Sequence, residues 1–312
     1  NQGVKLTVEN NNLKLNYKGI LPEDLINEIK KNKGDLINYL NKYSINDSFK
    51  EIIPVDNQES YDLSRAQLRV WLLSQFEESN RAYNMFNHNL FNDKPNLAIL
   101  KKAFLKVIER YEILRTNFFI DKNGDVKQKI IPFSSFNLKI GYIDKYNSSI
   151  EKVIGEKLFH SFDLKNENLI RIYLIKGKGN SHYLVLVIHH IICDGVSFRI
   201  IYDELLKYYN SFLNNNQLEL PPVKIQYKDY VNWEKKVAEE DNFLVSKKFW
   251  IELFSGELPT LNFPADKKRP FHKTYNGCEL RKNIRKDIFH NYKSILNKSG
   301  SSLFNGIFTL IN

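Results

Sequence analysis

The sequence predicts an α/β fold of the α+β type, because strand and helix signals follow one another along the chain. The run His182–Ile188 is almost wholly apolar and ends in two histidines, and a helical pattern extends onward from Ser197. This order is typical of a buried strand, a tight connection and a helix. Polar and apolar residues also alternate over 4–8 and 13–17, and Asn123-Gly124 separates two apolar runs. Both patterns predict β-hairpins.

The first 43 residues are expected to form a small separate unit. After the hairpin, Pro22 begins a helical pattern with its apolar residues on one face. Gly34 is expected to break this helix, and a second helix should end near Tyr43. A unit this small buries little apolar surface, so it needs a partner or a neighbouring domain for stability. Residues 44–51 have the polar character of a linker, and the larger domain is expected over 52–312.

The larger domain carries further helix and hairpin signals. Asn96 is expected to cap a helix whose apolar face continues to Tyr111. Gly177 and Gly179 are expected in a second hairpin turn, directly before the apolar strand. They are not expected to form a phosphate-binding loop, because no helix follows them.

Composition argues against several classes of function. The 312 residues include 46 basic and 36 acidic side chains, for a net charge of +10, but the basic residues are scattered and form no nucleic-acid-binding signature. Nucleic acid is therefore not an expected partner, and attraction to an acidic protein explains the charge equally well. The two cysteines, Cys193 and Cys278, lack the spacing of a zinc site, and Cys193 is expected to be a buried apolar group. No apolar run reaches membrane-spanning length and no signal peptide opens the chain, so a cytoplasmic protein is expected.

Two adjacent histidines end the apolar strand. Neighbouring residues of a regular strand point to opposite faces, so one of His189 and His190 is a candidate for chemistry and the other for structure. The alternative is that a histidine on an apolar strand is an ordinary core residue. Asp194 stands where a carboxylate can fix an imidazole or an arginine. Gly195 permits a backbone turn that a side chain would block, and Ser197 is expected to cap the following helix.

The pattern HHxxxDG over residues 189–195 resembles the active-site motif of the condensation domains of nonribosomal peptide synthetases. Those domains belong with the chloramphenicol-acetyltransferase-like acyltransferases. Three other segments resemble motifs of the same family: residues 64–71 match SxAQxRxW, residues 110–118 match RHExLRTxF with Tyr111 in place of the usual histidine, and residues 227–233 match YxDxxxW.

The resemblance implies an architecture and a reaction. Over residues 52–312 it implies one chloramphenicol-acetyltransferase-like lobe, with a mixed sheet and flanking helices, and the start of a second lobe. The reaction is amide-bond formation between a carrier-bound acyl or peptidyl donor and an aminoacyl acceptor, both held as thioesters on the phosphopantetheine arms of carrier proteins. No cofactor is then bound directly. Because the tunnel between the two lobes is incomplete, we expect residues 1–312 alone to be inactive.

The same resemblance suggests a role for each residue of the motif. His190 would orient the acceptor α-amine and secondarily accept its proton, and the Gly195 N–H would help to stabilise the oxyanion. His189 is expected to be structural. Asp194 is expected to form an ion pair, whose partner would be Arg115 or an arginine beyond residue 312.

Residues 1–43 resemble the βαα docking domains first described in tubulysin assembly, without the helix that precedes the first strand in that family. The resemblance implies that an upstream synthetase subunit docks here through an acidic C-terminal peptide. The peptide is expected to add as a strand to the exposed edge of the hairpin. Its expected contacts are Lys5, Lys14, Tyr17 and Lys18; the alternative is that these are ordinary solvated residues.

Other assignments of the histidine motif stay open. The SxAQxRxW form resembles the subtype that joins two L-configured residues, and heterocyclisation is disfavoured because those relatives carry aspartate at the position of His189. The alternatives are an epimerisation domain or a coenzyme A-dependent acyltransferase with the same motif, and a non-catalytic docking and scaffold piece. A docking unit directly ahead of the first motif argues against the two enzymatic alternatives.

Overall fold

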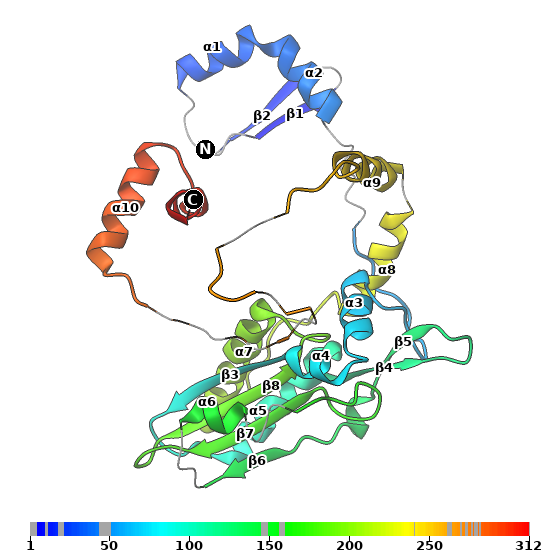
Figure 1. Cartoon of the computed structure of the whole chain (residues 1–312), viewed down its shortest axis with the longest axis vertical. Coiled ribbons are helices and arrows are strands. Elements are labelled where there is room, and N and C mark those ends of the chain that lie inside the picture. Colours follow the sequence, from blue (N-terminus) through cyan, green and yellow to red (C-terminus); the bar gives the residue numbers. More distant parts are fainter. Residues whose placement is uncertain are drawn as a thin grey trace. The chain divides into compact units, whose positions relative to one another are not determined.

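The computed structural model of the chain describes residues 5–9, 12–17, 22–43, 51–144, 149–155, 160–239, 241–260, 264–268, 270–271, 274–275, 277, 280 and 282–311. The chain divides into two compact units, residues 1–263 and 264–312. Figure 1 follows the chain through its helices and strands. Both kinds of element occur in the first unit, whereas the described elements of the second are helices.

The N-terminal region is a hairpin followed by two helices. β1 (Lys5–Glu9) pairs antiparallel with β2 (Asn12–Asn16). α1 (Glu23–Lys31) begins directly after Pro22, and α2 (Lys33–Tyr43) lies against both strands. The predicted hairpin, the helix start after Pro22 and the second helix that ends near Tyr43 are confirmed.

The break between α1 and α2 falls at Asn32, and the predicted break at Gly34 is wrong. The side-chain Nδ2 of Asn32 donates to the carbonyl oxygen of Glu28 at 3.0 Å, and its backbone N–H donates to the same oxygen at 3.1 Å. The Glu28 carbonyl thus accepts the last helical N–H of α1 and a side-chain N–H from the same residue, which closes the helix at Asn32. Gly34 lies inside α2, because a glycine costs a helix about 1 kcal/mol and does not by itself end it.

A mixed four-stranded sheet forms the centre of the larger region (Figure 1). Its strand order is β3 (Asn84–Phe91), β8 (His182–His189), β7 (Ile170–Lys176) and β6 (Ile140–Ile143). β8 runs antiparallel to both neighbours, and β6 pairs parallel with β7. The side chains from Leu184 to Ile188 are all fully buried, which explains why the strand is apolar at every position rather than at alternate ones. The sheet confirms the predicted fold class.

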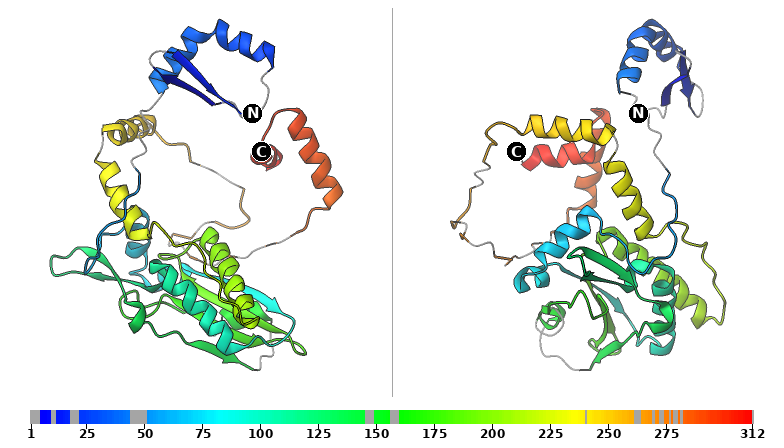
Figure 2. Two further views of the ribbon diagram at one scale, coloured as in Figure 1. Left: turned by 180° about the vertical axis from the view of Figure 1, so that it is seen from behind. Right: turned by 90° about the vertical axis from the view of Figure 1, so that its right-hand side faces the viewer.

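Two long helices cover one face of this sheet. α5 (Leu97–Arg110) and α7 (Gly195–Leu213) pack against each other there (Figure 2). α5 begins after Asn96, whose Oδ1 accepts the backbone N–H groups of Ala98 and Ile99 at 3.0 and 3.1 Å. The predicted cap is therefore confirmed. The apolar side of α5, including Phe104, is fully buried in the core between helix and sheet.

The two hairpin turns predicted in this region are confirmed. β4 (Thr116–Ile120) pairs with β5 (Val126–Ile130), and Gly124 in the turn has φ 86°. Gly179, between β7 and β8, has φ 59°. Glycine suits both positions because positive φ brings the Cβ of other residues close to the backbone.

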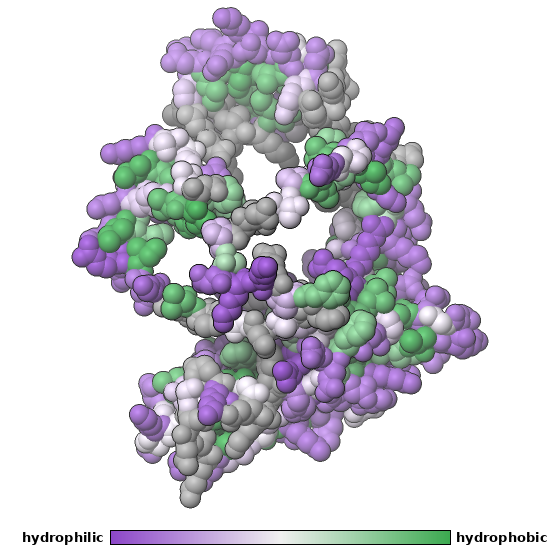
Figure 3. Space-filling model, viewed as in Figure 1, coloured by the Kyte–Doolittle hydropathy of each residue, from purple (hydrophilic) through white to green (hydrophobic). Residues whose placement is uncertain are grey.

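The remaining elements are short helices. In the first unit they are α3 (Arg65–Leu73), α4 (Glu77–Ala82), η1 (Glu112–Arg115), η2 (Phe133–Ser135), α6 (Ile150–Val153), α8 (Tyr227–Ala238) and α9 (Asp241–Leu253). The second unit contains α10 (Lys286–Lys298) and α11 (Leu303–Ile311). Figure 3 shows apolar side chains gathered over α9, α10 and α11 on the face in view. No helix within the described residues combines the length and the apolar character needed to cross a bilayer.

Candidate active site around His190

The two histidines at the end of β8 have opposite environments. His189 is the last residue of the strand and is 0% exposed, whereas His190 is exposed. The backbone N–H of His190 donates to the carbonyl of Tyr83 at 2.8 Å, which holds the chain as it leaves the strand. The strand periodicity left open which imidazole faces outward, and the family resemblance pointed to His190; in the structure His190 is exposed and His189 is buried.

His189 is held as a neutral imidazole inside the core. Its Nδ1 accepts the N–H of Ile191 at 3.2 Å, so the ring proton sits on Nε2, which lies 3.4 Å from Ser74 Oγ. That hydroxyl donates to the carbonyl of Val70 at 2.7 Å and keeps a lone pair for the histidine. Burial first, and then the charges of His190 and Arg171, together lower the pKa of His189 to about 3. The ring is therefore uncharged near neutral pH and fastens the turn that follows β8.

His190 lines a cavity of about 290 Å³. The other walls come from α3, from the turn that ends β8, from the first turn of α7 and from the start of α8. Polar groups on these walls belong to Gln67, Arg69, Asp194, Ser197 and Tyr227. Ile113 of η1 also lines the cavity, so segments that match all four family motifs meet there, although they are spread over residues 64–233.

Asp194 caps α7, and the prediction that Ser197 does so is wrong. The Asp194 Oδ1 accepts the backbone N–H of Ser197 at 2.7 Å and its Oγ–H at 2.6 Å. Ser197 is the third helical residue, so its own N–H is one of those that need a cap. The hydrogen bonds from Ser197 hold the pKa of the Asp194 carboxyl below its usual range.

The expected ion pair between Asp194 and Arg115 is not formed, although both residues lie within the described part of the chain. The Arg115 Nη1 donates to the carbonyl of Ile131 at 2.6 Å, and its Nη2 lies 3.9 Å from a Glu112 carboxylate oxygen. The Asp194 carboxylate instead accepts hydrogen bonds from Ser197 at the N-terminus of α7. Each group has found a local partner, so Arg115 supports the hairpin rather than the histidine motif.

Gly195 does not occupy the special turn conformation that the sequence suggested. It is the first residue of α7, its φ is not positive, and a Cβ placed on it would meet no atom within 4 Å. The absence of a side chain there leaves open space beside the histidine motif. Cys193, by contrast, is 5% exposed, and burial raises the pKa of its thiol to about 12, so it is a buried group as expected and not a thiolate nucleophile.

Only part of the predicted docking contact lies among the described residues. Lys14 is in β2 with an exposed side chain, and Tyr17 directly follows the strand and is 50% exposed. Lys5 opens β1, but its side chain lies outside the described part, as does the whole of Lys18. Two of the four residues therefore have exposed side chains, one within the second strand and one directly after it.

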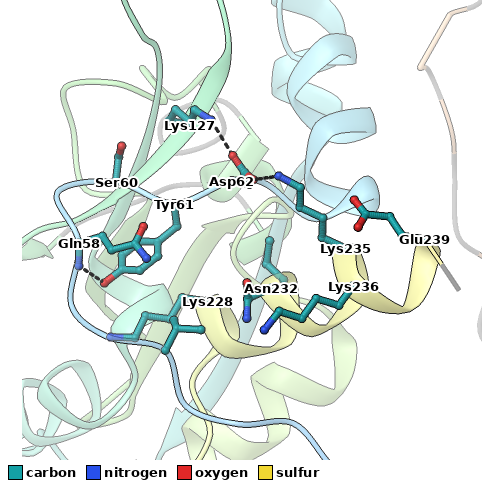
Figure 4. A pocket seen from close by; sticks show the side chains of 12 residues that line it. Gln58, Ser60, Tyr61, Asp62, Lys127, Lys228, Asn232, Lys235, Lys236 and Glu239 are labelled. Atoms are coloured by element: carbon teal, nitrogen blue, oxygen red, sulfur yellow. Dashed lines mark hydrogen bonds and ion pairs between the residues drawn. The ribbon is translucent and has the colours of Figure 1, made fainter. Parts of the chain in front are cut away.

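A second cavity, of about 350 Å³, lies where residues 55–62 pass α8 and β5 (Figure 4). In Figure 4 the Asp62 carboxylate stands between Lys127 and Lys235, which donate to it at 2.6 and 2.7 Å. These bonds, that from Lys127 first, lower the pKa of Asp62. Lys228 pairs with Glu112 at 3.0 Å. Three lysines of this cavity are therefore matched by acids of the same chain, and it offers no reactive group comparable with His190.

Three polar residues of the His190 cavity, Gln67, Arg69 and Tyr227, were not predicted from the sequence as site residues, although each lies within a motif segment. A polar residue within a motif segment is the sequence signal that could have identified each of them. Among the described residues, no group of three or more histidine, cysteine or acidic side chains is arranged to hold a metal ion.

Comparisons with known proteins identify the family of the chain. Residues 57–310 match the family model described as a condensation domain, and residues 1–42 match that of the TubC N-terminal docking domain. Gramicidin S synthase 2 of Brevibacillus brevis is 33% identical over 258 residues, which cover 83% of this chain and 6% of that protein. The chain therefore spans a small part of its curated relative.

Two solved structures share the fold. The X-domain from teicoplanin biosynthesis superposes with a TM-score of 0.67 at 22% identity, over 81% of this chain and 56% of that one. The EpoB NRPS cyclization-docking bidomain from Sorangium cellulosum gives 0.63 at 19% identity, over 96% of this chain and 60% of that one. From the family matches and the curated relative, we conclude that the chain belongs to the condensation-domain family of nonribosomal peptide synthetases and carries a TubC-type docking domain on its N-terminal side.

Proposed function

We propose that this chain supplies the histidine that positions the acceptor amine for amide-bond formation within a complete synthetase. The donor is an acyl or peptidyl thioester and the acceptor is an aminoacyl thioester, each on the phosphopantetheine arm of a carrier protein. The observation that supports this most is the exposed ring of His190 in a cavity walled by the other family motifs. The SxAQxRxW form favours the subtype that joins two L-configured residues.

Positioning is the main contribution in this mechanism. The α-amine of a peptide titrates near ~7.7–8, so a substantial fraction is already neutral and nucleophilic near neutral pH. Holding it against the thioester carbonyl can supply much of the acceleration, since oriented pairs reach effective molarities of roughly 10⁵–10⁸ M. His190 orients the amine and accepts its proton as the tetrahedral intermediate collapses, which is worth about 10²–10⁴-fold. The new C–N bond forms when the amine attacks the carbonyl carbon, and the C–S bond breaks when the intermediate collapses, with the thiolate of the donor's phosphopantetheine arm as the leaving group.

In the proposed mechanism, the N-terminus of α7 supplies electrostatic stabilisation of the oxyanion. The first N–H groups of a helix have no partner within the helix, and its dipole adds partial positive charge there. Asp194 takes up the N–H of Ser197. Gly195 is the first residue of α7, and its N–H would donate to the developing oxyanion; a Cβ placed on Gly195 would meet no atom within 4 Å, so space is open at this position.

The experiment that tests this proposal is a turnover assay of the complete synthetase with loaded donor and acceptor carrier proteins. We expect His190→Ala to lower the rate of amide formation by about 10²–10⁴-fold. His160→Ala is the matched control, because His160 is exposed outside the cavity. Parent-like product formation by His190→Ala would refute the proposed role.

For residues 1–43 we propose a docking function, with 44–51 as a linker to the condensation domain at 52–312. An acidic C-terminal peptide of an upstream synthetase would add as a strand beside the hairpin, where backbone bonds give affinity and side chains give specificity. Lys5, Lys14, Tyr17 and Lys18 would contact it. Titration of synthetic acidic peptides against this chain, with Lys14→Glu as the variant, tests the idea. Saturable binding that Lys14→Glu weakens is expected, and no saturation by any cognate peptide would contradict it.

A further inference from the structure

A line of hydrogen bonds runs along the wall of the His190 cavity from α8 to the turn that carries the histidine. The hydroxyl of Tyr227 lies 2.9 Å from Ser64 Oγ, and that oxygen accepts the backbone N–H of Gln67 at 3.0 Å. The side-chain Nε2 of Gln67 then donates to the carbonyl of Ile191 at 3.5 Å. Gln67 and Tyr227 both line the cavity, and Gln67 is only 2% exposed.

The orientation of the Gln67 amide follows from the cap of α3. Ser64 is the N-cap of this helix, and the backbone N–H of Ser64 donates to Gln67 Oε1 at 3.1 Å, which completes a capping box. A side-chain amide carries its oxygen and its NH₂ on opposite sides. Because the oxygen is committed to Ser64, the NH₂ group is turned toward Ile191. The bond to Ile191 is the longest of the set, but its direction is dictated by the shorter bonds of the cap.

The turn that bears His190 is held by neighbouring groups while the ring itself stays exposed. The N–H of His190 is bonded to Tyr83, the N–H of Ile191 to His189 Nδ1, and the carbonyl of Ile191 to Gln67. Gln67 is the contact among these that comes from the cavity wall, and it belongs to the SxAQxRxW segment. That segment therefore has a direct physical connection to the histidine motif.

We propose that Gln67 is a positioning residue for His190. The capped end of α3 presents the Gln67 amide to the Ile191 carbonyl, and Tyr227 braces that end through Ser64. This inference rests on the proposed reaction at His190, because a group held within a fraction of an ångström matters most where orientation supplies the rate. Under this proposal, the motif segments at residues 64–71 and 227–233 both help to hold the turn that carries His190.

Gln67→Glu in the complete synthetase is the sharpest test. The glutamate keeps an oxygen to accept the Ser64 N–H, so the capping box survives, but its ionised form has no donor for the Ile191 carbonyl. We expect kcat for amide formation to fall by about tenfold or more, with KM for both loaded carrier proteins within about twofold of the parent. Because burial raises the pKa of a carboxyl group, we expect part of the activity relative to the parent to return as the pH is lowered, when the protonated acid donates again.

Hydrogen exchange gives a second readout that does not depend on turnover. In Gln67→Glu, exchange should quicken at the amides of residues 190–192 and stay unchanged within α3, because the cap is retained. Tyr227→Phe should lower kcat by a smaller factor, about threefold. Tyr230→Phe is its matched control, since the Tyr230 hydroxyl lies on the same helix but bonds to Glu234 at 3.2 Å.

Two outcomes would overturn the inference. One is a parent-like kcat and parent-like exchange at residues 190–192 in Gln67→Glu. The other is an equal effect of Tyr230→Phe and Tyr227→Phe, which would mean that loss of any hydroxyl on α8 matters. If the parent synthetase itself forms no amide, the proposed reaction fails, and the exchange comparison still decides whether Gln67 holds the turn.

Discussion

His189 and His190 are identical side chains on adjacent residues, yet the structure treats them as different groups. The first has both ring nitrogens engaged and a pKa lowered to about 3, whereas the second lines an open cavity. The difference arises from what surrounds the end of β8: core on one side and the wall of α3 and α8 on the other. Comparing them teaches that the reactivity of an imidazole is set by its surroundings rather than by its place in a motif.

The largest expected effect is on stability, when each of the two imidazole rings is removed in turn. We expect His189→Ala to lower the free energy of unfolding by about 2–4 kcal/mol, because it leaves a cavity and strips the Ile191 N–H and Ser74 Oγ of a buried partner. His190→Ala should change it by no more than about 0.5 kcal/mol. Urea denaturation measures both, and equal effects of the two substitutions would contradict the assignment.

The pH dependence of stability should sharpen the contrast. The ordinary pKa of histidine is 6.5 and that of folded His189 is about 3. Between these values the unfolded chain binds the additional proton, so the free energy of unfolding falls as the pH is lowered, by at most about 1.4 kcal/mol per pH unit. His189→Asn should remove this component of the slope below pH 6.5. Parallel slopes for parent and variant would show that His189 is not buried as a neutral ring.

Loss of the N-terminal cap of α7 should have a smaller effect on the free energy of unfolding. Asp194→Ala should cost about 1 kcal/mol through loss of the cap, and Asp194→Asn only a few tenths, because an amide oxygen can still accept the Ser197 N–H. Since the pKa of folded Asp194 is lowered, its stabilisation is present above the ordinary value of 3.8 and is lost as the pH falls through the lower folded value. Thermal unfolding of the three proteins near neutral pH and in acid checks both the ranking and its disappearance.

At Gly195 we expect a small change in stability, in the favourable direction. A Cβ there meets nothing within 4 Å, so Gly195→Ala should be neutral or stabilise by about 0.4–1 kcal/mol. If the reacting groups pass this position, as the proposed role of the Gly195 N–H requires, the added methyl group should nevertheless lower the turnover rate. An unchanged rate in the carrier-protein assay would mean that the reacting groups do not pass Gly195.

Local hydrogen bonding explains which parts of the fold could be predicted. The cap at Asn96, the turns at Gly124 and Gly179 and the helix start after Pro22 all depend on contacts within a few residues. Two predictions were wrong, the helix break at Gly34 and the helix cap at Ser197. In each case a nearby residue was able to fill the same structural role. In both cases a side chain that reached back to the backbone decided the position: Asn32 ended α1 and Asp194 began α7.

The sequence indicated where the candidate site lies, but not all of the residues that line it or how they are connected. HHxxxDG pointed to residues 189–195, and the structure places one of its two imidazoles at a cavity. Arg115 was expected to meet Asp194, but it reaches the carbonyl of Ile131 instead. Gln67 and Tyr227 escaped notice because their contacts, to Ile191 and Ser64, join residues more than a hundred positions apart.

The sequence by itself determined the alternation of strands and helices, the hairpin turns and the fact that only one histidine of the pair faces any given side. The tertiary structure decided which one, because the pairing of β8 with β3 and β7 and the packing of Phe162 and Ser74 close the space around His189. Periodicity is a property of neighbouring residues along the chain. Exposure depends on distant segments that share the same space, and those meet only when the chain is folded.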